Sequence, residues 1–247
     1  MEYMSLVGFA VCSPDPELRE RLPFPCNDID RTTIPAMLRR RSSQAMQLAF
    51  SAASEVCAQT GRLPADLPAI FASVAGEIQT TDQICTELAK PDGLISPSAF
   101  HNSVQNTAAG YWSIAQHCTQ AASALAAGQD TFAMALLEAW CQLACQGGEL
   151  LVVCYDESWP GYLAPGSGQP AFATALILAA DVVESSIARL GKPQQQSVDF
   201  PAQWKALADG MPVLAAIPLL DWLVNREEVT TLPIGFASEG WLIDINL

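Results

Sequence analysis

Three short apolar runs constrain the fold of this chain more than any other feature of its sequence. They occupy residues 6–12, 69–74 and 149–155, and turn-forming residues border each of them. Runs of this length are typical of strands that are buried on both faces. Segments with apolar residues at helical spacing separate them, at 36–60, 80–89 and 130–145. Strands and helices in this order predict an α/β layered fold with a mainly parallel or mixed sheet.

The rest of the chain carries weaker patterns. We expect helices over 108–116, 204–207 and 214–224, a loop over 156–170, an exposed linker over 191–197 and a final strand over 241–247. Residues 171–180 are apolar without a clear period, so a buried strand and a helix both stay open. A chain of 247 residues can bury one full hydrophobic core. We interpret residues 1–247 as a single domain whose carboxy-terminal extension begins near residue 191.

The charge balance argues against strongly negative partners. The chain has 26 acidic and 12 basic residues, and its formal net charge is −14. A surface of this sign repels nucleic acid and anionic membranes, so we expect neither as a partner. No apolar run is long enough to cross a bilayer. Arg39, Arg40 and Arg41 form the only basic cluster, which is either a solvated helix start or the place where an acidic partner approaches.

Eight cysteines are scattered along the chain, mostly within apolar runs, and the first residues lack the pattern of a secretory signal. A reduced, cytoplasmic protein is therefore the simpler interpretation. Cys141 and Cys145 lie four residues apart, but no second pair and no nearby histidine accompanies them. We therefore expect no metal site, and no cofactor.

Residues 96–128 hold the groups best suited to chemistry near neutral pH. Both histidines, His101 and His117, lie there together with Cys118. One hypothesis is an acyltransferase or thioesterase in which Cys118 is the nucleophile and His101 the base, oriented by Asn102 or Asn106. Sequence neighbours such as His117 and Cys118 point to different sides of a helix or strand, and a buried cysteine near a histidine more often contributes to packing.

A second feature of this stretch is a run of small residues that leads into the helix expected from residue 130. Residues 122–128 predict a strand-to-helix elbow, the type of turn that exposes a nucleophile at the positive end of a helix. The residue at its tip is Leu125, and a leucine cannot form a covalent acyl intermediate. A shift of a few positions brings Ser123 or Cys118 into consideration instead.

Four stretches occur in the order found in one family. They are Arg-Arg-Arg-Ser-Ser-Gln-Ala-Met-Gln-Leu-Ala at 39–49, Ile-Phe-Ala-Ser-Val-Ala-Gly-Glu at 70–77, Ile-Ser-Pro-Ser-Ala-Phe-His-Asn-Ser-Val-Gln-Asn-Thr-Ala-Ala-Gly-Tyr-Trp-Ser-Ile at 95–114 and Leu-Val-Val-Cys-Tyr-Asp-Glu at 151–157. Because of these four stretches, residues 6–180 of the chain resemble the short β-ketoacyl-synthase-like subunits. These chain-length-factor-like proteins of aryl polyene systems correspond to the amino-terminal half of a ketosynthase.

The resemblance implies a thiolase-like layered fold, and dimerisation through a region that here includes 106–114. Active ketosynthases place a cysteine at the elbow and two histidines in the second half of a longer chain. This sequence departs from both features, because Leu125 stands at the expected nucleophile position and the chain is short. The resemblance therefore implies a catalytically silent subunit.

Such a subunit pairs with a full-length ketosynthase and shapes its acyl channel in polyene, polyketide or fatty-acid-type elongation. Acyl carrier protein delivers the substrates to the complex. The candidate lining or interface residues are Phe100, His101, Val104, Asn106, Gly110, Tyr111 and Leu125, each of which is alternatively a plain core residue. Two other functions stay open, namely the Cys118-dependent enzyme and a scaffold that binds carrier protein without affecting chain length.

Overall fold

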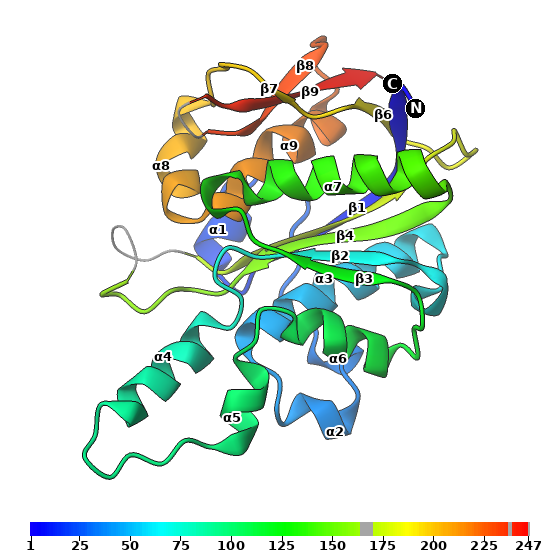
Figure 1. The fold of residues 1–247 in the computed structure, drawn as a ribbon. Coiled ribbons are helices and arrows are strands. Elements are labelled where there is room, and N and C mark those ends of the chain that lie inside the picture. The colour runs from blue at the N-terminus through cyan, green and yellow to red at the C-terminus, as the bar shows by residue number, and fades with distance from the viewer. Residues whose placement is uncertain (164–169, 237–238, 247) are drawn as a thin grey trace.

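The computed structural model describes residues 1–163, 170–236 and 239–246 of the chain (Figure 1). Within them the strands form one mixed sheet in the order β3-β2-β4-β5-β1-β6-β9-β7, with β8 paired to β9. The strands are β1 (Tyr3–Cys12), β2 (Ala69–Ala72), β3 (Ala122–Leu125), β4 (Glu149–Asp156), β5 (Phe172–Ala179), β6 (Ala188–Gly191), β7 (Gln194–Gln195), β8 (Thr231–Gly235) and β9 (Trp241–Asn246).

Parallel pairing is confined to one side of this sheet. β2 pairs in parallel with both β3 and β4, whereas β4 pairs with β5, and β5 with β1, in antiparallel fashion. The mixed alternative of the predicted sheet is therefore the correct one. The three apolar runs that defined the prediction form β1, β2 and β4, and their residues are almost all buried.

Helices cover both faces of the sheet (Figure 1). The α-helices are α1 (Pro16–Arg21), α2 (Ala36–Arg39), α3 (Gln44–Thr60), α4 (Ile78–Leu88), α5 (Pro97–Asn102), α6 (Thr107–Ala115), α7 (Thr131–Gln146), α8 (Ala202–Gly210) and α9 (Ile217–Asn225). Short 3-10 turns are η1 (Arg31–Thr33), η2 (Pro64–Asp66), η3 (Gly128–Asp130) and η4 (Pro212–Ala216). α3 and α6 belong to the core on one face of the sheet, and α7, η4 and α9 to the core on the other.

Several predicted boundaries differ from the structure for identifiable reasons. The predicted helix over 36–60 is wrong as one element, because the chain leaves the helix after α2 and starts again at α3. Ser43 makes the break by accepting a hydrogen bond from the Met46 amide as the N-cap of α3. At its other end α3 stops at Gly61, whose φ of 67° is the left-handed conformation that favours glycine.

The carboxy-terminal part also departs from expectation. Of the two alternatives for residues 171–180, the strand is correct, since Phe172–Ala179 form β5. The sequence left the choice open because a strand buried on both faces lacks the alternation that marks a half-buried strand. The exposure predicted for 191–197 is confirmed at Gln194 and Gln195, but the segment is not an unstructured linker, since Gly191 ends β6 and β7 pairs with β9. The predicted helix over 214–224 begins as the 3-10 turn η4 and continues as α9. The predicted loop over 156–170 and final strand over 241–247 each extend beyond the described residues.

α4 and α5 form an arm that extends away from the sheet (Figure 1). The arm leaves the carboxyl end of β2 and returns to the body at α6. The sequence predicted α4 but not α5, which has only six residues. Ser96 is the N-cap of α5, and Pro97 occupies its first helical position. None of the helices in the described parts of the chain is long and apolar enough to cross a membrane.

Candidate functional site

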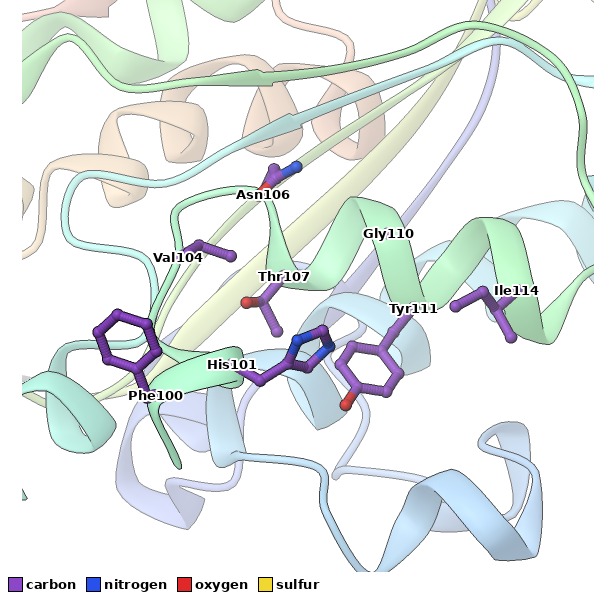
Figure 2. Close-up of a pocket in the computed structure, with 8 residues that line it drawn as sticks. All are labelled: Phe100, His101, Val104, Asn106, Thr107, Gly110, Tyr111 and Ile114. Atoms are coloured by element: carbon purple, nitrogen blue, oxygen red, sulfur yellow. The ribbon is translucent and has the colours of Figure 1, made fainter. Parts of the chain in front are cut away.

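An open groove lies between α5 and α6, with a volume of about 610 Å³ (Figure 2). Eight residues line it: Phe100, His101, Val104, Asn106, Thr107, Gly110, Tyr111 and Ile114. Six of the seven residues predicted from the sequence are among them, and Leu125 is the exception. Thr107 and Ile114 lie within the dimerisation region 106–114 that the resemblance implied, but the sequence interpretation did not name them individually. Ile114 lies four residues after Gly110 on α6, so helical periodicity carried the signal that could have found it.

The groove presents large apolar side chains to solvent. Phe100 and Ile114 are each 64% exposed and Val104 is 49% exposed. Plain core packing, the alternative role for the predicted residues, therefore does not apply to Phe100 or Val104. Tyr111 is mostly buried instead, and its ring meets that of His101 edge to face at 6.2 Å. Contiguous exposed apolar surface of this kind marks an interaction or ligand-binding surface on a folded protein.

Gly110 widens the groove on the side of α6. A Cβ atom built on this glycine would meet no atom within 4 Å, so the missing side chain leaves open space beside Tyr111 and Ile114. Any larger residue here would project into that space and reduce the room for an occupant.

A buried asparagine holds the two helices of the groove together. The Asn102 side-chain oxygen accepts a hydrogen bond from the Tyr111 hydroxyl at 2.9 Å, and its amide donates to the Arg41 carbonyl at 2.9 Å. The Thr107 hydroxyl donates to the Asn102 carbonyl at 2.8 Å. Asn102 is the buried residue of α5, so polar contacts more than apolar packing fix that helix. The sequence interpretation considered Asn102 only as the orienter of a catalytic histidine.

The predicted elbow is present, but its turn carries no nucleophile. Leu125 is the last residue of β3, where it pairs with Ala72, and its half-buried side chain packs against the core. The chain then turns through Gly128, which has a φ of 57°. The buried Thr131 hydroxyl accepts a hydrogen bond from the Ala127 amide and donates to the Gly128 carbonyl. The hydroxyl nearest the turn is therefore already used to brace it.

The cysteine and histidines of the alternative hypothesis do not form a hydrogen-bonded pair. Cys118 is buried, and its thiol donates to the Leu67 carbonyl at 3.5 Å. His117 is exposed with a φ of 53°, and His101 lies in the groove against Tyr111. In the described parts of the chain no hydrogen bond joins a histidine to a cysteine, and no group of three or more His, Cys, Asp or Glu could hold a metal ion.

Three buried thiols elsewhere, Cys12, Cys57 and Cys154, and the half-buried Cys26 are held in their unreactive form. Burial raises the pKa of Cys12, Cys26 and Cys57 to about 12 in each case, and it also raises the pKa of Cys154. A thiol with such a pKa is protonated at neutral pH, and the protonated form is a poor nucleophile. Cys85, Cys141 and Cys145 are exposed.

The sequence was compared with family models and with known proteins. The model described as beta-ketoacyl synthase, N-terminal domain, matches residues 15–231, which is most of the chain. No curated protein matches the sequence.

Solved structures give the fold. A chain of the ketosynthase ApeO in complex with its chain length factor ApeC, from Xenorhabdus doucetiae, is 19% identical, with a TM-score of 0.72, over 99% of this chain and 100% of that one. A chain of the ishigamide ketosynthase/chain length factor is 13% identical, with a TM-score of 0.68, over 98% of each chain. A chain of the AntDE:AntF complex, a type II PKS acyl-carrier protein with its ketosynthase, is 11% identical, with a TM-score of 0.73, over 99% of each. These matches confirm the predicted thiolase-like, α/β layered fold.

Replacing Asn102 should loosen the groove. In Asn102→Ala the buried Tyr111 hydroxyl loses its partner, and we expect the free energy of unfolding to fall by about 1–3 kcal/mol. Urea unfolding followed by circular dichroism measures this. The control is Asn106→Ala, an exposed groove residue for which we expect a change within about 0.5 kcal/mol. Equal effects of the two substitutions would contradict the assigned role of Asn102.

The thiols should differ in reactivity according to their exposure. Iodoacetamide at neutral pH should label Cys85, Cys141 and Cys145 first, and Cys118 at a rate at least about tenfold lower, because its thiol is buried and hydrogen-bonded. Mass spectrometry of timed digests gives the rates. If Cys118 were the fastest thiol to react, the Cys118-dependent enzyme would regain support.

Proposed function

The chain belongs to the family of β-ketoacyl synthase amino-terminal domains, and we propose that it is a catalytically silent subunit that pairs with an active β-ketoacyl-ACP synthase. The observation that carries this proposal is the groove between α5 and α6, where large apolar side chains face solvent. A partner surface that covered Phe100, Val104 and Ile114 would remove this apolar area from water. Each such side chain contributes about 1.5–3 kcal/mol when it is fully buried.

The edge of the sheet next to the groove supports the same partner surface. α6 packs against β3, and β3 is the last strand of the sheet on that side. Its residues alternate between exposed and half-buried. An exposed edge strand with free backbone groups is a template for pairing with another chain. The groove and the β3 edge are therefore the two places where we expect a second subunit to bind.

The composition of the elbow supports catalytic silence. From Leu125 to Gly128 the turn offers only hydrocarbon side chains and glycine, so it holds no group that could accept an acyl chain. The nearest thiol in sequence, Cys118, points its Sγ atom at the Leu67 carbonyl. In the proposed heterodimer the partner ketosynthase supplies the nucleophile and the histidines, and this chain supplies one wall of the acyl channel.

We infer the substrate class from the chemistry of that wall. Its side chains are apolar or aromatic around a few polar groups, as expected for a pocket that accepts an acyl chain. Two of the structural matches come from ketosynthase and chain length factor complexes. We therefore place this chain in polyene or polyketide-type elongation, with an aryl polyene as the favoured product, and we assign it the control of chain length by steric fit.

Acyl carrier protein would reach the complex near the arginine cluster. Arg31, Arg39, Arg40 and Arg41 lie in a stretch, residues 31–54, that contains no acidic residue, although the whole chain has a net charge of −14. None of the ion pairs in the described parts of the chain involves these arginines. Arg39, Arg40 and Arg41 line a surface hollow with a volume of about 660 Å³ together with Met37. An acidic carrier protein is electrostatically complementary to this surface.

Charged substitutions in the groove should weaken pairing with the ketosynthase. Phe100→Arg or Ile114→Arg places a charge where the partner would bury apolar surface, so we expect binding to the full-length ketosynthase to weaken by at least about tenfold. Co-expression followed by copurification and titration measures this. The matched control is Leu94→Arg, since Leu94 is 87% exposed and lies outside the groove. A monomer that never copurifies with a ketosynthase would refute the proposal.

The size of Phe100 should set the product length. In the assembled complex Phe100→Ala enlarges the channel and should shift the products towards longer chains, whereas Phe100→Trp should shorten them. Mass spectrometry of the carrier-bound or released products gives the distribution, with Leu94→Ala as the control. An unchanged distribution in both variants would leave this chain as a scaffold without control of length.

A further inference from the structure

Three acidic side chains are buried together where the arm joins the sheet. Glu77 is 2% exposed, and Asp156 and Glu157 are each 1% exposed. Acidic residues are almost never fully buried unless they are paired with a cation. None of the ion pairs in the described residues includes these three carboxyls. The sequence interpretation assigned them no role.

Asp156 holds the turn through which the arm leaves β2. Its carboxyl accepts hydrogen bonds from the Ser73 hydroxyl at 2.6 Å and from the amides of Val74 at 3.1 Å and Ala75 at 3.2 Å. The Ser73 hydroxyl in turn accepts from the Gly76 amide at 2.7 Å. The last residue of β4 thus fixes the first residues of the arm.

Glu157 joins the first turns of two helices. One carboxyl oxygen accepts from the Ala45 amide of α3 at 3.3 Å, and the other accepts from the Gln79 amide of α4 at 3.0 Å. Both amides lie in first turns, where backbone N–H groups lack a partner within the helix and the helix dipole favours negative charge. Glu157 therefore ties α4 of the arm to α3 of the body.

Glu77 lies beside them without a hydrogen bond to either carboxyl oxygen from the described residues. Burial raises its pKa to about 7. The nearby hydroxyls of Ser43 and Thr80, which do not reach hydrogen-bonding geometry, lower this pKa, and the charge of Glu157 raises it. Burial likewise raises the pKa of Asp156 to about 7 and raises that of Glu157. The other titratable groups that interact with the cluster are Tyr155 and Cys154, whose pKa values are raised as well. No cation contributes to these shifts of Glu77, Asp156 or Glu157.

We propose that Glu77, Asp156 and Glu157 form a proton-dependent latch that holds the α4–α5 arm against the body of the protein. The buried site is stable when a proton on Glu77 or Asp156 limits the number of adjacent negative charges. When all three carboxyls ionise, their repulsion and the cost of burying charge favour an arm that moves out into water. Because α5 carries Phe100 and His101, opening the latch displaces one wall of the groove.

The direction of the pH effect follows from the raised pKa values. The closed arm binds protons more tightly than the open arm, in which the carboxyls regain their ordinary pKa values near 4. The closed state is thus favoured fully at acid pH and loses stability as pH rises towards about 7. The latch depends only on this chain, and it stands whether or not the groove binds a partner.

Hydrogen–deuterium exchange on the full chain tests the latch. Between pH 5.5 and 8.5, after correction for the intrinsic exchange rate, amides of residues 78–102 should lose protection by at least about tenfold, since each unit of raised pKa changes the closed-to-open ratio by about a factor of ten. The amides of α7 serve as the internal reference for global unfolding. Equal pH dependence of the arm and α7 would overturn the proposal.

Substitution then identifies the titrating group. Glu77→Gln keeps the shape of the side chain but cannot ionise, so the loss of protection with pH should shrink severalfold in this variant. Glu87→Gln is the matched control on the same helix, because Glu87 lies at the exposed end of α4 in an ion pair with Lys90. Unaltered pH dependence in Glu77→Gln would remove Glu77 from the latch. If Glu77→Gln fails to fold, the comparison of arm and α7 in the unmodified chain still decides the question.

Discussion

Burial of the sheet on both faces is the constraint on which the rest of the structure depends. Every residue of β5 is buried, and so is every residue of β4 after the first. A strand in this position needs a layer of helices on each face, and α3 and α7 supply the two layers. The covering becomes incomplete at β3, the exposed edge strand against which α6 packs. The open groove lies where the layered packing ends, so the fold itself places unburied apolar surface at the edge of the molecule.

The elbow that follows this edge strand is compatible with the proposed catalytically silent subunit. The elbow between β3 and α7 depends on Gly128 and on the hydroxyl of Thr131, neither of which has to react with a substrate. A hydrocarbon side chain at Leu125 adds to the packing against the core. Retaining the elbow therefore stabilises the start of α7, and the groove between α5 and α6 is the surface that we propose for another subunit.

The sequence predicted those parts of the structure that are marked by apolar residues alone. The stripe of α7 was clear from its helical spacing, and β1, β2 and β4 were clear as short continuous apolar runs. The break before Ser43 was missed because apolar residues recur at helical spacing on both sides of it, although α2 ends at Arg39 and Ser43 caps a new helix. Six groove residues were found through a family resemblance. The carboxyl cluster was missed because a buried Glu77 and an exposed glutamate look the same in sequence, and only the tertiary structure brings residues 77 and 156–157 together.

Arm and body are held by different forces. The body is held together by hydrophobic burial, which hardly changes with pH. The arm has little such burial, because Ile84 is the buried residue of α4 and Asn102 is that of α5. The arm is instead fastened by hydrogen bonds of Asn102, by Gln105 donating to the Ser73 carbonyl, and by the carboxyls at its root. Elements with few buried apolar contacts open at lower free energy than the core. One wall of the groove can therefore respond to protonation while the sheet and its covering helices stay fixed, because that wall is the part whose position depends on ionisable groups.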